Sequence, residues 1–258
     1  MCVDFVQDEQ GVTLLFEDGE SIRTDLVIAA DGIHSSIRKK LLPSSSIRYA
    51  GYTCWRSVVP FDYGDEIHRS SEIWGHDGRF GYIPLPSGQV YWFACINAEA
   101  NDPIRSAYTV DDLLKLFGHF PHPVKNMIQA ANNDRLIHND IYDIQPLQQF
   151  AFGRIVLLGD AAHATTPNMG QGAGQAMEDA VVLSQCMELQ SNFNDAFKMF
   201  EQKRLQRTRK IIEKSRQVGS VSQWSHPALI SLRDSLLKLV PNSLMSIPMQ
   251  ALGRTDWE

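Results

Sequence analysis

The sequence lacks the features that mark membrane, secreted and nucleic-acid-binding proteins. Its longest apolar runs, such as residues 155–158, fall far short of the ~20 residues that a membrane-spanning helix needs. Residues 1–4 show no signal-peptide pattern. Lys and Arg number 24 against 30 Asp and Glu, so the net charge of −6 supplies no basic field for a nucleic acid or an anionic membrane. We therefore expect a soluble, cytoplasmic protein that binds neither.

Cysteine is also scarce, with four residues in 258 and no C-x-x-C pair. A chain of this length can fold on its hydrophobic core, so the sequence predicts reduced and mostly buried thiols. His119 and His122 have no cysteine or carboxylate at the spacing of a metal site. We therefore expect no metal.

What remains is a globular composition, with 43% hydrophobic and 21% charged residues. Alternating residues over 12–25, with a turn at Asp18-Gly19, predict a β-hairpin. Residues 26–30 form a continuous apolar run that Asp31-Gly32 closes, which is typical of a buried strand in a parallel sheet. A helix is predicted to follow over residues 35–42.

The middle of the chain has a different character. Residues 49–97 contain short runs rich in Trp, Tyr, Val and Ile between glycines and prolines, which predicts a mostly antiparallel sheet. Thr109 is a good N-cap for a helix over 110–117, and a second helix is predicted over 123–131. We expect these two helices to cover one face of the sheet.

A second buried strand is predicted over residues 154–158, followed by Gly159-Asp160 and a glycine-rich loop at residues 170–174. A helix begins in that loop. Its apolar residues recur at spacings of 3 and 4 and are expected to form the stripe that packs on the sheet. This predicted stripe consists of Ala176, Ala180, Leu183 and Met187.

Two further helices complete the chain. The helix predicted over residues 195–218 carries a run of Lys and Arg that includes Arg204, Arg207 and Arg216, and such a run is usually a solvated face. The last helix is predicted over Pro227–Leu239.

Both apolar strands end in an aspartate beside a glycine. Ligands of open parallel sheets bind at the carboxyl ends of the strands, so both ends are candidate sites. At the second end, the glycines of residues 170–174 let backbone N–H groups approach a ligand, and the following helix directs its positive end there. Asp160 could accept hydrogen bonds from the hydroxyls of a sugar alcohol.

These segments resemble two motifs of the FAD-dependent aromatic-ring hydroxylases. The run from Asp31-Gly32 through Ser35 to Arg38 is similar to their D-G-x-x-S-x-x-R motif. The run from Gly159-Asp160 through Pro167 to Gly174 and Glu178-Asp179 is similar to their G-D motif. Within that family the FAD-dependent urate hydroxylases look most similar. The resemblance implies an α/β (mixed α+β) PHBH-like fold, with FAD as cofactor and NAD(P)H as reductant.

The resemblance also implies roles for individual residues. Asp160 would lie near the ribityl chain of FAD, while Asp31, Gly32 and Arg38 would lie near the pyrophosphate and the path of the reductant. The implied contacts of the second loop with the cofactor are made by Gly159, Pro167, Gly170, Gln171, Gly172, Ala173 and Gly174.

The domain organisation that the resemblance implies is discontinuous. Residues 1–47 and 140–225 would form a partial FAD-binding domain, residues 48–139 a substrate domain and residues 226–258 a helical tail. No G-x-G-x-x-G follows a strand, although the family begins with such a unit. We therefore expect that this chain is the C-terminal portion of a monooxygenase. Purified alone, it should be colourless. A separate chain could supply the missing unit.

For the substrate, Arg79 and Tyr91 stand at the positions where the urate hydroxylases place an anion-binding Arg and an assisting Tyr. An Arg can neutralise a planar anionic ring, and a Tyr hydroxyl can orient it. Cys54 stands where those enzymes have Asn, and we expect Cys54, Trp74 and Trp92 to share the pocket. His163 is expected to be structural. A solvated Arg79 and a Tyr91 that only packs in its strand remain the alternative.

The function that the resemblance implies is an FAD-dependent monooxygenase that uses NAD(P)H and O2 to hydroxylate a small planar aromatic or heteroaromatic substrate. A flavin reductase or an epoxidase on the same fold is an alternative, because a fold does not determine a reaction. A non-catalytic remnant that cannot hold FAD alone is a third.

Overall fold

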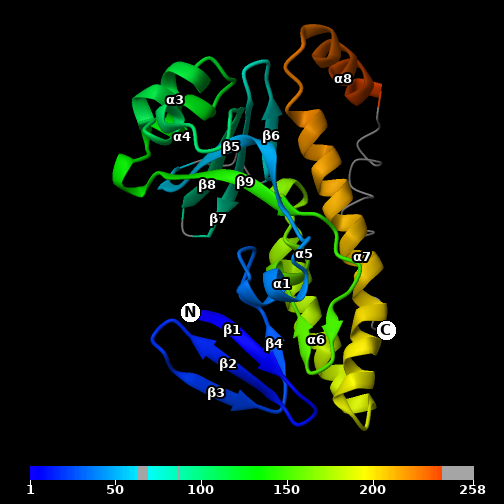
Figure 1. Ribbon diagram of the computed structural model, residues 1–258. Coiled ribbons are helices and arrows are strands. Elements are labelled where there is room, and N and C mark those ends of the chain that lie inside the picture. Colours follow the sequence, from blue (N-terminus) through cyan, green and yellow to red (C-terminus); the bar gives the residue numbers. More distant parts are fainter. Residues whose placement is uncertain (63–68, 87, 240–258) are drawn as a thin grey trace. The chain divides into compact units, whose positions relative to one another are not determined.

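The computed structural model describes residues 1–62, 69–86 and 88–239, and these form two compact units (Figure 1). The first unit comprises Met1–Arg48 and Tyr142–Val218, and the second comprises Tyr49–Ile141 and the described residues from Gly219 onward. Within the described ranges we find no helix with the length and hydropathy needed to cross a membrane. The functional identities expected for the domains remain predictions.

A three-stranded antiparallel sheet opens the first unit. It consists of β1 (Cys2–Gln7), β2 (Val12–Phe16) and β3 (Ser21–Thr24). The pairing of β2 with β3 confirms the predicted hairpin. Gly19 adopts a φ of +85° in its turn, a conformation that glycine reaches without strain.

A second small sheet contains the two predicted buried strands. β4 (Val27–Ala29) and β11 (Ile155–Leu157) pair in parallel, and β10 (Ala151–Phe152) pairs with β11 in antiparallel fashion. Both strands therefore point their carboxyl ends in the same direction. After β4, the helix α1 (Ser36–Leu41) begins where the Ser35 hydroxyl accepts a hydrogen bond from the Arg38 N–H.

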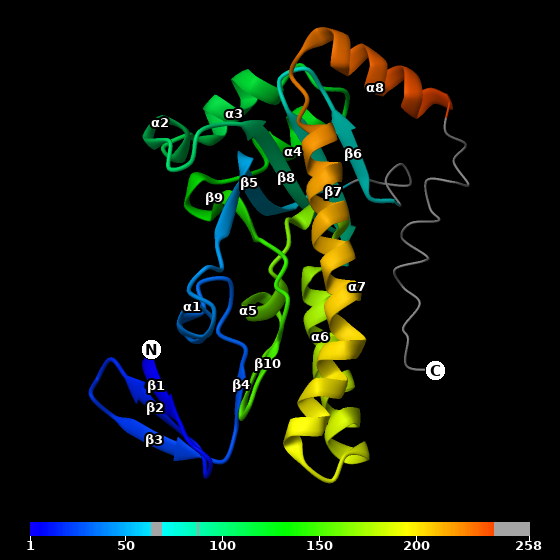
Figure 2. The same cartoon turned by 45° about the vertical axis from the view of Figure 1, so that its right-hand side comes forward.

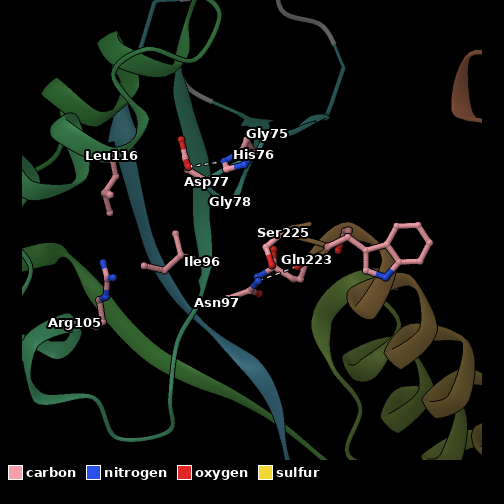
Figure 3. Close-up of a pocket in the computed structure, with 12 residues that line it drawn as sticks. Gly75, His76, Asp77, Gly78, Ile96, Asn97, Arg105, Leu116, Gln223 and Ser225 are labelled. Carbon is pink, nitrogen blue, oxygen red and sulfur yellow. Dashed lines mark hydrogen bonds and ion pairs between the residues drawn. The ribbon is translucent and has the colours of Figure 1, made fainter. Parts of the chain in front are cut away.

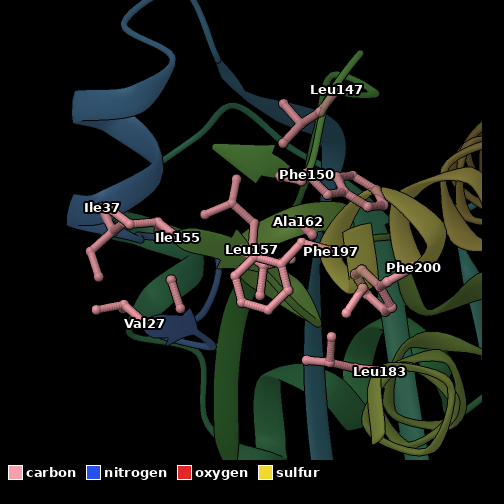
Figure 4. Close-up of a cluster of buried hydrophobic side chains, with 14 of the residues drawn as sticks. Val27, Ile37, Leu147, Phe150, Ile155, Leu157, Ala162, Leu183, Phe197 and Phe200 are labelled. Carbon is pink, nitrogen blue, oxygen red and sulfur yellow. The ribbon is translucent and has the colours of Figure 1, made fainter. Parts of the chain in front are cut away.

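Helices cover this sheet. The short helix α5 (Asp160–His163) follows β11, and the long helices α6 (Gly172–Leu189) and α7 (Phe193–Ser222) lie side by side within the first unit (Figures 1 and 2). The core between the strands and helices is apolar and closely packed (Figure 4). Its fully buried side chains include Ile155, Leu157, Phe197 and Phe200.

The face of α6 that is buried differs from the predicted one. Ala180 and Met187 are exposed, and Ala176 is only half-buried. The inward side instead carries two polar residues, because Gln175 and Asp179 bind partners inside the unit. The buried residues of α6 are Gln175, Asp179, Val182, Leu183 and Cys186. Hydrophobic periodicity therefore located Leu183 correctly, but the buried face of the helix is offset by one residue from the predicted stripe.

The basic run of α7 is only partly the solvated face that the sequence predicts. Arg204 is 3% exposed and binds Asp179 and Glu178 of α6. Arg207 also pairs with Glu178. Arg204 and Arg207 turn inward because α6 presents carboxylates to them, whereas Lys203, Lys210 and Lys214 are exposed. The spacing within one helix cannot reveal this division.

The second unit is built on one sheet, in the strand order β6-β7-β8-β5-β9. The pairings of β6 with β7, β7 with β8 and β8 with β5 are antiparallel, which confirms the prediction. The strands are β6 (Ser71–Trp74), β7 (Arg79–Leu85), β8 (Gln89–Asn97), β5 (Ile47–Pro60) and β9 (Ile137–Ile144).

Short helices pack on one face of this sheet. Phe80 and Trp92, with rings 5.4 Å apart, lie in the same buried cluster as residues of α3 and α4. Trp92 therefore belongs to the helix-covered core, and its expected place in the substrate pocket is wrong. The helices of this unit are α2 (Pro103–Ser106), α3 (Val110–Phe117), α4 (Val124–Gln129), the 3-10 turn Asn133–Arg135 and α8 (Pro227–Leu239).

Candidate functional site

The ends of the two parallel strands bring the two predicted loops to one edge of their sheet. Ala29 lies opposite Leu157, and the Leu158 N–H donates to the Ala29 carbonyl at 3.0 Å. Asp31-Gly32 follows β4 by one residue, and Gly159-Asp160 follows β11 by one residue. The two motifs thus meet at the carboxyl edge, where parallel sheets bind their ligands.

Arg38 links the two loops by hydrogen bonds. Its side chain is 1% exposed, and its Nη1 donates to the Ala161 carbonyl at 3.1 Å while Nη2 donates to the Ile33 carbonyl. Burial lowers the pKa of Arg38, although the nearby charge of Asp31 opposes that shift. The guanidinium thus holds backbone in place, and its expected role on the reductant path remains a prediction.

The glycine-rich loop leaves backbone open to a ligand. A Cβ built at Gly170 or Gly174 meets no atom within 4 Å, and one at Gly172 meets only the Thr165 methyl group at 3.6 Å. Gly170, with a φ of +61°, ends the 3-10 turn Pro167–Met169. No side chain caps the start of α6, so its first N–H groups are available to an acceptor.

Glycine is required at the other two loop positions for different reasons. Gly32 has a φ of +79° and faces open space. Gly159 has a φ of +59°, and a Cβ there would lie 3.3 Å from the Ala176 methyl group. Both loops therefore depend on a backbone conformation that other residues adopt only with strain.

The two aspartates of the motifs have different environments. Asp31 accepts a hydrogen bond from the Ser36 N–H at 3.0 Å and thereby supports the start of α1. Asp160 is exposed at the first position of α5, and among the described residues no group binds its carboxylate. Asp160 can therefore accept hydrogen bonds from a ligand, such as a polyhydroxy chain.

A buried ionic network lies under this edge. Its carboxylates belong to Glu178-Asp179 at the end of the second motif, but the sequence does not indicate their partners. Asp179 accepts hydrogen bonds from the Gly159 N–H at 2.9 Å, from His163 Nε2 at 2.5 Å and from Arg204 Nε at 2.6 Å. Burial alone would raise the pKa of Asp179, but these donors outweigh it and lower the pKa. The network holds the Gly159-Asp160 turn against α6 and α7, and His163 is part of that support.

In the second unit, Arg79 lies on the sheet face opposite to the helix-covered one. It is 2% exposed, its Nη1 donates to Glu72 Oε1 at 3.0 Å, and its guanidinium lies 5.0 Å from the centre of the Tyr52 ring. Trp74 donates to the same Glu72 oxygen at 2.9 Å. Arg79 is therefore not the solvated turn residue of the alternative interpretation.

Tyr91 shares this face with Arg79 but lies some distance along the strands. Arg79 is opposite Cys95, and Tyr91 precedes Cys95 by four residues on β8. The backbone of Tyr91 therefore lies about 13 Å along the strand from the position opposite Arg79. Burial raises the pKa of the half-buried Tyr91. The pair can contact one ligand only from different ends of it. Cys54 lies opposite Cys95 on the other neighbouring strand.

A separate cavity of about 310 Å³ lies at the end of the second unit's sheet (Figure 3). Gly75–Gly78, the end of β8 and residues 222–225 line it, and Asn97 Nδ2 donates to the Gln223 carbonyl at 2.8 Å beside it. None of the residues predicted for cofactor or substrate lines this cavity. Among the described residues no cluster of His, Cys, Asp and Glu could hold a metal ion.

The chain is similar to known flavoproteins along most of its length. Residues 2–215 match the family model of the FAD binding domain. Aurachin C monooxygenase/isomerase from Stigmatella aurantiaca is 37% identical over 237 residues, which cover 92% of this chain and 61% of that protein. FAD-dependent urate hydroxylase from Klebsiella pneumoniae is 36% identical over 220 residues, which cover 81% of this chain and 55% of that protein.

The fold is shared with a solved structure as well. The crystal structure of Klebsiella pneumoniae HpxO complexed with FAD and uric acid superposes with a TM-score of 0.89 at 31% identity, covering 97% of this chain and 65% of that one. The chain thus spans about three-fifths of the length of the proteins that it matches. On this sequence and structural similarity, the chain belongs to the FAD binding domain family and to its flavin monooxygenases of PHBH-like fold.

Proposed function

We propose that this chain is part of an FAD-dependent monooxygenase that uses NAD(P)H and O2 to hydroxylate a small planar aromatic or heteroaromatic compound. The observation that carries this proposal is the shared carboxyl edge of β4 and β11, where an exposed Asp160 and the open backbone of residues 170–174 occur together. The relatives that are named as a monooxygenase and a hydroxylase support the reaction type.

The residues at this edge fit a flavin. Open space beside Gly170 and Gly174 admits a flat ring against the backbone, and the uncapped start of α6 would stabilise negative charge on that ring. Asp160 would accept hydrogen bonds from the ribityl hydroxyls. When bound, FAD supplies the redox chemistry by which electrons from NAD(P)H and one atom of O2 reach the substrate.

The substrate is proposed to bind on the Arg79 face of the second unit. Glu72 already compensates much of the charge of Arg79, and Tyr52, Cys54 and Phe93 surround it with weakly polar surface. Such a site favours a planar ring that is neutral or carries one delocalised negative charge over a highly anionic one. Tyr91 would orient the far end of the ring.

The first experiment tests the flavin site through riboflavin and FAD binding. We expect the purified chain to be colourless and to quench the fluorescence of added flavin in a saturable titration. Asp160→Ala should weaken binding about 10- to 100-fold, because a charged hydrogen bond contributes about 1.5–3 kcal/mol. Asp111→Ala, at an exposed position of α3, is the matched control and should leave the affinity unchanged. Equal affinity of the Asp160 variant would contradict the ribityl role.

A second experiment tests the reaction. The chain with FAD, NADH or NADPH, ¹⁸O2 and a panel of planar aromatic and heteroaromatic compounds should yield a product that contains one labelled oxygen atom. Oxidation of the nicotinamide with no label in any organic product would instead identify a reductase. Label in an epoxide would identify an epoxidase. If the chain neither binds flavin nor converts any compound, the non-catalytic remnant would be favoured.

A further inference from the structure

Two of the four cysteines form a buried pair on the Arg79 face. Cys54 of β5 lies directly opposite Cys95 of β8, and they are 3% and 1% exposed. They belong to one apolar cluster with Tyr52 and Ile141. Each thiol shifts the pKa of the other, and the Cys54 thiol also donates a hydrogen bond to the Trp55 carbonyl at 3.5 Å. Cys54 lines the proposed substrate site, but no chemical step of the proposed hydroxylation uses either thiol.

The backbone geometry permits a bond between them. Directly opposite residues of an antiparallel pair have Cα atoms about 4.5–5.5 Å apart. A disulfide requires a separation of about 4.4–6.8 Å, so this pair could be joined without a shift of either strand. The other cysteines offer no such pairing, because Cys2 lies opposite Phe16 and Cys186 is buried in the core of the first unit.

The surroundings distinguish the two thiols. β8 lies between β7 and β5, so Cys95 has Arg79 on one side and Cys54 on the other. Burial raises the pKa of Cys95, but the interaction with the Cys54 thiol and the charge of Arg79 outweigh burial and lower it. The same interaction, together with burial and the charge of Cys95, raises the pKa of Cys54. Cys95 is therefore the nucleophilic thiol of the pair.

We propose that Cys54 and Cys95 are an oxidation site at which hydrogen peroxide forms a reversible disulfide across β5 and β8. The Cys95 thiolate attacks one peroxide oxygen, the O–O bond breaks, and the departing hydroxide takes up a proton to become water. The Cys54 thiol then attacks the sulfur of the Cys95 sulfenic acid, the S–O bond breaks, and the hydroxide leaves as water with the Cys54 proton. Two thiols are oxidised by two electrons in all, and one peroxide is reduced to two waters.

The oxidation would change the surroundings of Arg79. A disulfide sulfur carries no charge and is a poor acceptor, so the interaction between Arg79 and Cys95 would be lost. Given the proposed function, this site would respond to peroxide released when NAD(P)H oxidation is not coupled to hydroxylation. The oxidation site itself does not depend on that function, because the peroxide can be added directly.

Peptide mapping of the intact chain tests the site. Trypsin places Cys54 in the peptide of residues 49–56 and Cys95 in that of residues 80–105. After brief treatment of the folded chain with hydrogen peroxide, blocking of free thiols and digestion without reductant, we expect these two peptides as one species that is two hydrogens lighter than their sum. Dithiothreitol should separate them. Absence of this species, or its appearance only after unfolding, would overturn the proposal.

Single variants test the order of attack. In Cys54→Ser, peroxide should leave a sulfenic acid on Cys95 that dimedone traps, whereas in Cys95→Ser residue Cys54 should stay unmodified. Arg79→Gln should slow the formation of the disulfide about tenfold, since a cation beside a thiol favours the thiolate. Cys186, which is buried without a neighbouring thiol in the core of the first unit, is the internal control within each sample and should remain reduced. Equal oxidation of Cys186 and Cys95 would show that the reaction is not specific to the pair.

Discussion

The two units use their charged side chains in opposite ways. In the first unit, Asp179, Arg204 and Arg38 are buried and bind one another or backbone carbonyls, which leaves open backbone and the exposed carboxylates of Asp31 and Asp160 at the ligand edge. In the second unit, a buried side chain, Arg79, is itself the candidate binding group, and it pairs with the carboxylate of Glu72. A rigid backbone site suits a cofactor that does not vary. Side chains on a sheet can be substituted without a change of fold, which suits a site whose substrate differs between related proteins.

The largest effect is expected from breaking the ionic network of the first unit. Arg204→Leu would leave the buried carboxylates of Asp179 and Glu178 without their shared cation. Removing one partner of a buried ion pair costs about 3–5 kcal/mol of folding free energy. Urea unfolding followed by circular dichroism measures this loss. Lys210→Ala, at an exposed position of the same helix, should change stability by less than about 0.5 kcal/mol.

Equal stability of the Arg204 and Lys210 variants would show that the network adds nothing to the fold. In that case, the Gly159-Asp160 turn would have to be held by its own backbone alone.

The next effect separates two glycines that have nearly the same φ but different ψ values, −139° at Gly159 and 22° at Gly170. The second is the left-handed helical conformation that other residues can also adopt. Gly159 and Gly170 have φ values of +59° and +61°, but only a Cβ at Gly159 would press on a neighbour, the Ala176 methyl group. Gly159→Ala should therefore cost about 1–3 kcal/mol, the range for a strained backbone position, and Gly170→Ala should fall at the low end of that range. The difference between their urea midpoints is the measurement. A reversed order would mean that α6 moves away at no cost.

In the second unit, enzyme kinetics test the roles of Arg79 and Tyr91. Arg79→Gln should reduce kcat/KM by the equivalent of about 1–3 kcal/mol, because a charged hydrogen bond to the substrate is lost. Tyr91→Phe should act mainly on kcat, while oxidation of NAD(P)H continues uncoupled from hydroxylation and reduces O2 to hydrogen peroxide. Steady-state assays of product and peroxide separate the two. If both variants hydroxylate a panel of planar anions as well as the parent does, the substrate lies elsewhere than on this sheet face.

Local signals made much of the fold predictable. Thr109 and the residues that follow it specify α3, and the amphipathic run Pro227–Leu239 has the bounds of α8. The strand-end loops could also be located, because glycine and aspartate directly after an apolar run are typical of a buried strand that ends at a ligand-binding edge. The buried side of α6 could not be predicted, because the carboxylates of α6 and the cations of α7 form their ion pairs only in the folded unit.

In the second unit, the alternation of side chains along a strand can be read from the sequence, and it contradicts the expectation that Trp92 shares the substrate pocket. Tyr91 and Trp92 are neighbours in β8, so they must face opposite sides of the sheet. Trp92 and Tyr91 could therefore never have lined one pocket. The pairing of Cys54 with Cys95 was not accessible in this way, since the register between β5 and β8 depends on where both strands begin and end.

The smallest change in stability is expected for Gly174→Ala, and this variant separates an effect on folding from an effect on flavin binding. Gly174 lies inside the first turn of α6 with an ordinary helical backbone, and a Cβ there meets no atom within 4 Å. Gly174→Ala should therefore stabilise the chain, by up to about 0.5–1 kcal/mol, because alanine loses less backbone entropy in a helix. The same methyl group would occupy the space in which a flavin ring approaches the backbone, so flavin affinity should fall while the urea midpoint rises. Opposite signs in these two measurements would place the ligand against Gly174. A variant that is more stable and binds flavin as well as the parent would remove this loop from the proposed cofactor site.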